Sequence, residues 1–109
     1  MHELSIAESI VAAVTEKVSD TPIRRIQVQV GRLSGVVPDA LEFCFELACT
    51  GTVLQGAELE IVSSPGRGRC RTCVHEFDTD DLIAMCRCGS VDIEVIGGRE
   101  LLIREVEVV

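Results

Sequence analysis

The sequence predicts an α+β fold, with two helices on a small, mostly antiparallel three-stranded sheet and an inserted zinc-ribbon-like lobe. Two observations support this fold class. Apolar residues recur with a helical period in two segments and alternate with polar residues in others, and four of the six cysteines fall between residues 70 and 88. We therefore expect residues 1–64 and 92–109 to form one α+β unit and residues 65–91 to form a metal-binding lobe.

Two segments have the apolar periodicity of an amphipathic helix. The first covers residues 4–18, where apolar side chains recur every three or four positions: Leu4, Ala7, Val11, Val14 and Val18. The second begins at Pro38 and Asp39, residue types that favour a first helical turn, and extends to about Thr50. Each helix is expected to bury one face and to expose the other.

Strands are predicted where apolar and polar side chains alternate, at residues 25–30, 57–63 and 99–109. A shorter strand is predicted at 92–96, followed by a turn at Gly97 and Gly98. Within the last strand the alternation slips at Leu101 to Ile103, where three apolar residues are consecutive, which predicts a bulge. The tripeptide 64–66, Ser-Pro-Gly, is typical of a linker and is expected to lead into the metal-binding lobe.

The predicted lobe contains two close pairs of cysteines, in the patterns C-x-x-C and C-x-C. Four thiolates on two facing turns supply the tetrahedral ligand set that structural zinc prefers. Gly89 follows the second pair and fits such a turn, because glycine adopts a positive φ at little cost. We therefore predict a structural Zn²⁺ site formed by Cys70, Cys73, Cys86 and Cys88.

Other uses of these cysteines have to be weighed. The second pair is one residue shorter than usual, so its thiolates are harder to aim at one ion, and His75 could replace Cys86 or Cys88 as a ligand. A disulfide framework is less favoured, because the N-terminus carries Glu3 and lacks the basic region of a secretory signal. A redox dithiol would require only one of the two pairs. A cytoplasmic location is expected because the N-terminus does not resemble a secretory signal.

Composition excludes several classes of partner. The chain has 109 residues and a formal net charge of −8, which repels phosphate backbones and weighs against nucleic-acid binding. No apolar run approaches the ~20 residues of a membrane-spanning helix. Aromatic residues make up only 3% of the chain, so the core is expected to be aliphatic.

A histidine stands at the second position, in Met1-His2-Glu3, directly before the first predicted helix. The free α-amine, the amide nitrogen of His2 and its imidazole can form adjacent chelate rings around one metal, and the Glu3 amide could complete a square plane. Ni(II) and Cu(II) favour that geometry, whereas zinc does not. From this tripeptide alone, an exposed histidine on a frayed terminus is the commoner interpretation.

Four segments stand out in order along the chain: MHELSIAESIV, VGRLSGVVPDALEF, the paired cysteines with the terminal CGS, and IEVIGGRELLIREVEV. Together they resemble the HypA/HybF family of hydrogenase nickel-incorporation proteins over nearly the full length. The resemblance implies a nickel metallochaperone that delivers Ni(II) to the large subunit of [NiFe] hydrogenase, in cooperation with a HypB-type GTPase. A homodimer is compatible with the sequence.

The resemblance also implies the two metal sites. It places nickel on His2, with the Met1 amine and the Glu3 backbone adjacent, and zinc on the four cysteines of the lobe. Family members usually have C-x-x-C where this chain has Cys86-Arg87-Cys88.

A carrier is predicted rather than an enzyme, because the sequence shows no pairing of nucleophile with base and no phosphate-cradling glycine loop. The alternative function is a zinc-ribbon module that acts only through protein contacts, without metal delivery. Nickel binding that depends on His2 would distinguish the two functions.

Overall fold

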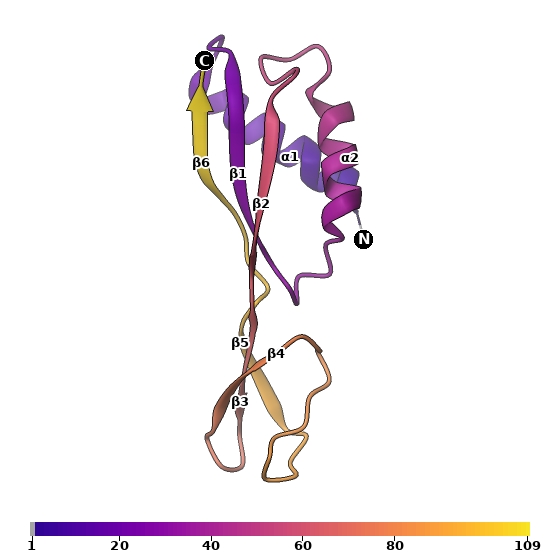
Figure 1. Cartoon of the computed structure of the whole chain (residues 1–109), viewed down its shortest axis with the longest axis vertical. Helices are drawn as coiled ribbons and strands as arrows, with labels where there is room; N and C mark the ends of the chain where they lie inside the picture. The colour runs from indigo at the N-terminus through magenta and orange to yellow at the C-terminus, as the bar shows by residue number, and fades with distance from the viewer. Residues whose placement is uncertain (1) are drawn as a thin grey trace.

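The computed structural model describes residues 2–109, which form two helices and six strands arranged in two three-stranded sheets. The molecule is elongated, with extents of 54, 21 and 17 Å along its principal axes. Both helices lie beside the first sheet at one end, and the second sheet forms the other end (Figure 1). The predicted α+β fold class is therefore confirmed. No helix within residues 2–109 is both long and apolar enough to cross a membrane.

The two predicted helices are present with nearly the predicted bounds. α1 spans Glu3–Val18 and α2 spans Pro38–Cys49. Pro38 begins α2 because a first-turn position has no intrahelical partner for the N–H that proline lacks. α1 buries Ala7, Val11 and Val14 of the predicted apolar stripe, together with Ile10, whereas Leu4 at the start of the stripe is 46% exposed.

The first sheet has the order β2-β1-β6, with β1 (Ile23–Gly31) between β2 (Glu58–Ser64) and β6 (Leu101–Val108). β1 pairs antiparallel with β6 but parallel with β2. The parallel pairing arises because α2 lies in the crossover that returns the chain to the same end of the sheet before β2 begins. Over both sheets, three of the four strand pairings within residues 2–109 are antiparallel.

One hydrophobic core joins both helices to the same face of this sheet. Its members from β1 are Ile23, Ile26, Val28 and Val30, which contact the buried side chains of α1 and α2 in a single cluster. Phe45 is buried in it, and the rest is largely aliphatic, as the composition predicts. Full burial of each such aliphatic side chain contributes about 1.5–3 kcal/mol, so this core stabilises the helical end of the molecule.

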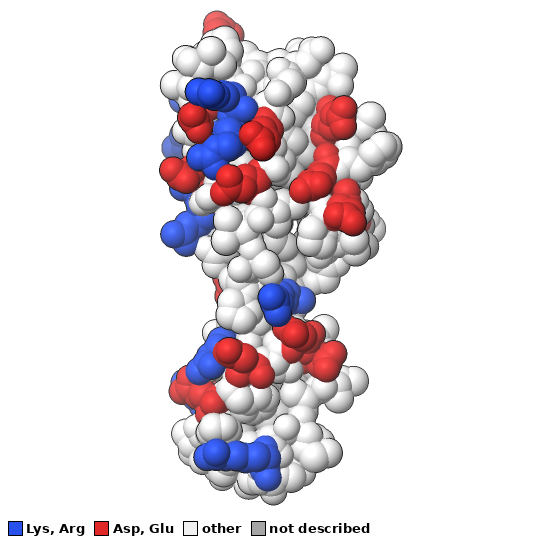
Figure 2. Space-filling view, in the orientation of Figure 1, with Lys and Arg blue, Asp and Glu red and all other residues white. Residues whose placement is uncertain are grey.

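The outer face of the first sheet is charged. Arg25 on β1 forms ion pairs with Glu60 on β2 at 2.8 Å and with Glu107 on β6 at 3.0 Å. Figure 2 shows positive and negative side chains intermingled over this sheet. The predicted bulge lies one residue beyond the predicted position, because Gln27 and Val28 pair with Glu105 and Ile103 and leave Arg104 as the additional residue.

The second sheet has the order β4-β3-β5, with β3 (Gly66–Cys70) between β4 (Glu76–Thr79) and β5 (Ile93–Gly97), and both pairings are antiparallel. The predicted strand at 92–96 is β5, and it lies in this sheet. The predicted linker at 64–66 is wrong, because only Pro65 separates β2 from β3. The sequence Gly-Arg-Gly-Arg has no apolar alternation, which is why β3 was not predicted.

Backbone hydrogen bonds join the two sheets where β2 passes into β3 and the chain returns from β5 to β6. The N–H of Leu33 donates to the carbonyl of Gly98 at 2.7 Å, and the N–H of Gly31 donates to the carbonyl of Glu100 at 2.8 Å. The Leu33 side chain is buried and lies close to the Cα of Gly66. This junction therefore fixes the second sheet to the end of the first.

Candidate metal centres

The first pair of cysteines lies in a turn at the end of β3. Cys70 is the last residue of β3, and its carbonyl accepts a hydrogen bond from the N–H of Val74 at 2.9 Å. The N–H of Cys73 donates to the Sγ of Cys70 at 3.4 Å. Val74 has a φ of +66°, the left-handed conformation that closes the turn. The turn thus directs both thiols to one side.

The second pair lies in a matching turn. The N–H of Cys86 donates to the carbonyl of Ser90, and the N–H of Gly89 donates to the carbonyl of Cys86, each at 2.8 Å. Gly89 has a φ of +91°, as its place after Cys88 predicts. A hydroxyl contact of 2.9 Å between Thr72 and Ser90 connects the two turns. The shorter C-x-C spacing is therefore accommodated by a tight glycine turn.

The four thiol sulfurs converge on one point. All four Sγ atoms lie within 4.8 Å of one another, with Cys70 3.7 Å from Cys88 and Cys73 3.5 Å from Cys86. A tetrahedral zinc with Zn–S bonds of about 2.3 Å requires sulfur–sulfur separations of roughly 3.8 Å. Cys70 and Cys86 are buried, whereas Cys73 and Cys88 face solvent. The arrangement fits one four-coordinate metal ion.

The thiols of Cys70 and Cys86 have pKa values shifted in opposite directions. The N–H groups of Cys73 and Thr72 favour the Cys70 thiolate and lower its pKa to about 6. The Cys88 N–H favours the Cys86 thiolate, but burial and the neighbouring thiols outweigh it and raise the pKa of Cys86 to about 12. Four thiolates this close repel one another, so a bound dication is needed for all of them to ionise near neutral pH.

His75 lies outside this group of ligand atoms, which among residues 2–109 contains only the four cysteines. Its ring stacks on that of Phe77 with a centroid distance of 6.0 Å and an interplanar angle of 21°. Its carbonyl accepts a hydrogen bond from the N–H of Cys70 at 2.9 Å. His75 thus contributes its carbonyl and its stacked ring to the first turn, and its ring nitrogens are not part of the thiol cluster.

His2 lies at the start of α1, in the helical part of the molecule, whereas the thiols belong to the part that contains the second sheet (Figure 1). Its side chain is exposed and does not cap the helix, while its carbonyl accepts a hydrogen bond from the N–H of Ile6 at 3.1 Å. The structure therefore gathers the four cysteines but does not bring His2 to them. Met1, the third predicted nickel-site residue, lies outside the described residues.

Glu3 is buried, and its side chain makes a contact that the sequence analysis missed. Its carboxylate accepts a hydrogen bond from the N–H of Val37 at 3.1 Å, and this donor lowers the pKa of Glu3. An acidic residue in a first turn suggests only a favourable helix-end charge. No sequence signal connects position 3 with position 37.

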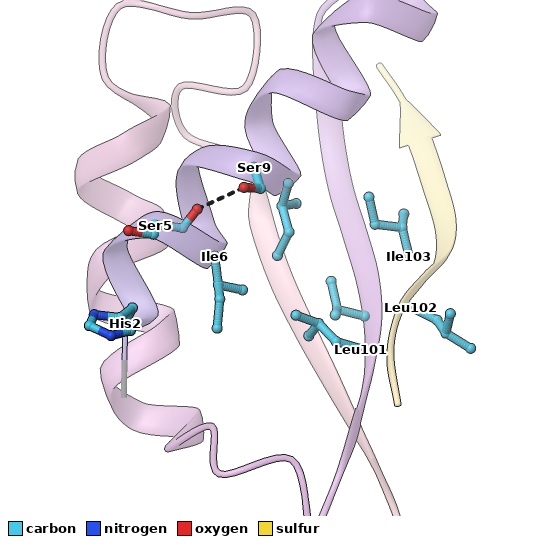
Figure 3. Close-up of a pocket in the computed structure, with 9 residues that line it drawn as sticks. His2, Ser5, Ile6, Ser9, Leu101, Leu102 and Ile103 are labelled. Carbon is cyan, nitrogen blue, oxygen red and sulfur yellow. Dashed lines mark hydrogen bonds between the residues drawn. The ribbon is translucent and has the colours of Figure 1, made fainter. Parts of the chain in front are cut away.

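A hollow of about 430 Å³ lies between α1 and β6, next to His2. Figure 3 shows His2, Ser5, Ile6 and Ser9 on the helix side and Leu101 to Ile103 on β6. The hydroxyl of Ser9 donates to the carbonyl of Ser5 at 2.9 Å. Most of the other side chains that line the hollow are apolar. This groove was not predicted from the sequence.

Comparison with known proteins gives one consistent result. The family model described as "Hydrogenase/urease nickel incorporation, metallochaperone, hypA" matches residues 1–108. The hydrogenase maturation factor HypA of Nostoc punctiforme is 46% identical over 108 residues, covering 99% of this chain and 96% of the relative. The corresponding protein of Rippkaea orientalis is 44% identical over 109 residues with the same coverage.

A solved structure agrees with these sequence matches. The solution structure of the Ni metallochaperone HypA from Helicobacter pylori has a TM-score of 0.69 to this chain at 26% identity. It covers 99% of this chain and 97% of its own.

Proposed function

The chain belongs to the HypA family of hydrogenase and urease nickel-incorporation metallochaperones, and we propose that it carries Ni(II) at its N-terminus to the large subunit of a [NiFe] hydrogenase. It acts there as a carrier and not as an enzyme. A HypB-type GTPase is its partner in delivery, and the transfer takes place in the cytoplasm.

The observation that carries the nickel proposal is the free imidazole of His2 at the start of α1. Because that side chain makes no cap, it is available to the metal together with the Met1 amine and the backbone amides of His2 and Glu3. Four nitrogen donors in a plane suit Ni(II). The Glu3 carboxylate already accepts a hydrogen bond from the N–H of Val37. It therefore positions the start of α1 and is not one of the nickel ligands.

We assign the four-cysteine site to structural Zn²⁺. Cys70, Cys73, Cys86 and Cys88 have the separations of a tetrahedral thiolate site, which zinc prefers and square-planar Ni(II) does not. Bound zinc would fix the two turns to each other and stabilise the small second sheet. The lobe has few buried side chains of its own, since Gly66, Gly68 and Cys70 are the buried positions of β3.

A second function is supported by the surface of the lobe. Leu82, Ile83 and Met85 are apolar and strongly exposed, with Ile83 at 90%. An exposed apolar loop is typical of a protein contact. A zinc-ribbon interaction module without metal delivery would use the same loop but would not require His2.

Nickel titration of the zinc-loaded protein distinguishes these functions. We expect one high-affinity Ni(II) site in the untagged chain, lost in His2→Ala and in a chain with residues added before Met1. His75→Ala is the matched control, because it removes the other histidine and leaves the N-terminus intact. The chain has no Trp or Tyr, so a nickel ligand-field band can be followed with little protein absorbance. An extended chain that binds nickel normally would refute the N-terminal site.

Metal analysis tests the zinc assignment. The purified protein should hold about one zinc per chain, and Cys73→Ser should lose it while α1 and α2 keep their helical signal. A chain with an intact second sheet, free thiols and no zinc would contradict the assignment.

A further inference from the structure

The solvent-facing side of α2 carries two rows of side chains. Phe43 and Leu47 are 64% and 56% exposed, and their spacing of four residues makes them neighbours on the helix surface. They form the apolar row. Asp39, Glu42 and Glu46 are exposed and follow one another at intervals of three and four residues, so they form an acidic row beside it.

The apolar row is unusual because it includes an aromatic side chain. The chain has three phenylalanines and no Trp or Tyr. Phe45 is 2% exposed in the core, whereas Phe43, on the same helix, faces solvent. Single exposed apolar residues are common on soluble proteins, but an adjacent pair that includes an aromatic ring is typical of a protein–protein contact.

The acidic row is unfavourable for the helix that carries it. Glu42 and Glu46 are four residues apart, so their charges repel each other along one side of α2. Glu46 also lies in the last turn, where the helix end is negative and α2 has no basic residue. A charge pattern that destabilises its own helix, with no compensating contact inside the molecule, is expected where the surface binds something else.

The carboxylates of the acidic row have no basic partner in the described part of the chain. Elsewhere carboxylates are paired, as Glu60 is with Arg25 at 2.8 Å. The ion pairs within residues 2–109 include no member of the acidic row. Figure 2 shows acidic side chains, and no basic ones, over the surface that α2 forms in this view. This surface attracts cations and repels nucleic acids and anionic lipids.

A hollow of about 350 Å³ lies beside the acidic row, between α2 and the start of β2. Glu42 and Glu46 line it together with Phe45, Cys49 and Leu59. Lys and Arg side chains bury an aliphatic stem along apolar surface while their charged end contacts polar atoms. The hollow therefore suits one long basic side chain, whose charged end would meet a carboxylate of the acidic row.

We propose that α2 docks a basic amphipathic helix of a partner protein. Such a helix repeats its side chains at intervals of three and four residues, so it presents an apolar row to Phe43 and Leu47 and a basic row to the carboxylates. One of its basic side chains occupies the hollow. α2 has 12 residues and is about 18 Å long, which accommodates about three turns of the partner. A second copy of this chain, with a net charge of −8, is a less suitable occupant of an acidic surface.

The docking surface begins next to the start of α1. Val37 precedes α2, is 53% exposed, and donates its N–H to the carboxylate of Glu3. A partner on α2 would therefore lie near the start of α1, which carries His2. Docking itself needs no nickel and does not depend on the proposed function, so it is tested on the zinc-loaded chain without nickel.

The test is titration calorimetry of the full-length chain with a capped amphipathic peptide of about 15 residues that carries a leucine row and an arginine row. We expect binding that Glu42→Gln/Glu46→Gln weakens about tenfold or more. The matched control is Glu8→Gln/Glu16→Gln, which removes two exposed charges from α1 and should change the dissociation constant less than about twofold. Equal weakening in both variants would mean that only net charge matters and would overturn the proposal.

The apolar row is tested in the same assay. Phe43→Ser/Leu47→Ser should weaken binding about tenfold or more, whereas Leu82→Ser/Ile83→Ser, at exposed positions outside α2, should leave it unchanged. Because all four side chains are exposed, these variants keep the core, which circular dichroism checks. Equal effects of the two double variants would overturn the docking site.

Two further peptides test the partner chemistry. A peptide with serine in place of leucine, and one with two central prolines that prevent a helix, should each bind about tenfold more weakly or worse. Amide NMR shifts should change along α2 on addition of the original peptide. Absence of binding at about millimolar concentration, shifts confined to other elements, or equal binding of the proline peptide would overturn the proposal. So would shifts along α2 that depend on protein concentration without peptide, because they would assign the surface to a second copy.

Discussion

The carboxylate of Glu3 accepts a hydrogen bond from the backbone N–H of Val37 at 3.1 Å, which ties the first turn of α1 to the residue that precedes α2. The positive end of α2 adds a favourable interaction with the same negative charge. This contact holds the start of α1, and therefore His2, against the rest of the fold.

Replacing Glu3 should consequently loosen the start of α1. We expect Glu3→Ala to lower the thermal unfolding midpoint, and Glu3→Gln to lower it less, because an amide oxygen can accept the same bond without the charge. Circular dichroism at neutral pH measures both. Glu8→Ala is the matched control, since Glu8 lies on the same helix and is exposed. Equal effects of Glu3→Ala and Glu8→Ala would contradict the role of the Val37 contact.

Glu100 makes stability depend on pH. Its carboxylate accepts hydrogen bonds from the N–H of Gly98 at 2.7 Å and from the hydroxyl of Ser64 at 2.8 Å, and these donors lower its pKa below the usual 4.5. The unfolded chain therefore binds a proton first as pH falls. The stabilisation is present above pH 4.5 and is lost as pH decreases through the lower folded pKa.

Glu100→Gln should remove that part of the acid sensitivity. We expect the difference in urea midpoint between the wild-type chain and Glu100→Gln to be largest near about pH 7 and to shrink toward about pH 3. Zinc release at low pH lowers the stability of both chains, so it does not change the difference between their urea midpoints. A difference that stays constant with pH would show that the carboxylate charge is not involved.

Gly97 and Gly98 are neighbours with opposite tolerance for a side chain. A Cβ at Gly98 would lie 2.5 Å from the Cα of Gly66, and the residue has a φ of +101°. A Cβ at Gly97 would meet only ordinary contacts of 3.5 Å or more. We expect Gly98→Ala to destabilise the protein by more than about 2 kcal/mol and Gly97→Ala by less than about 1 kcal/mol, measured by urea unfolding. Equal losses would mean that the junction can shift to admit the methyl group.

Val74 occupies a backbone conformation that suits glycine. Its φ is +66°, and its side chain is 67% exposed, so little packing compensates for the strain of a β-branched residue there. We expect Val74→Gly to stabilise the zinc-loaded lobe by about 1 kcal/mol, since the relieved strain exceeds the added entropy of the unfolded glycine. Resistance to zinc removal by a chelator is the measurement. Faster zinc loss in Val74→Gly would indicate that the valine side chain makes a contact worth more than the strain.

Elements with a strong local signal were predictable from the sequence. Both helices follow from the apolar period around Ala7 and Leu41, and the four cysteines identify their own site by spacing. The turn at Gly89 follows from one glycine after a ligand pair. The signal was insufficient for β3, whose Gly-Arg-Gly-Arg sequence has no apolar face, because a small sheet joined to a metal site needs little core of its own.

The packing of these elements against one another could not be predicted in the same way, because it depends on contacts between segments distant in the chain. Three contacts join segments that are distant in the chain: the parallel pairing of β1 with β2, the placement of β5 beside β3, and the hydrogen bond from Val37 to Glu3. The position of β6 at the edge of its sheet likewise follows from the strand order. Periodicity shows which side of a strand is apolar, but it does not show which strand lies next to it or whether anything covers that side. The neighbours of each strand and the segments that cover its apolar side depend on how the whole chain packs around one core.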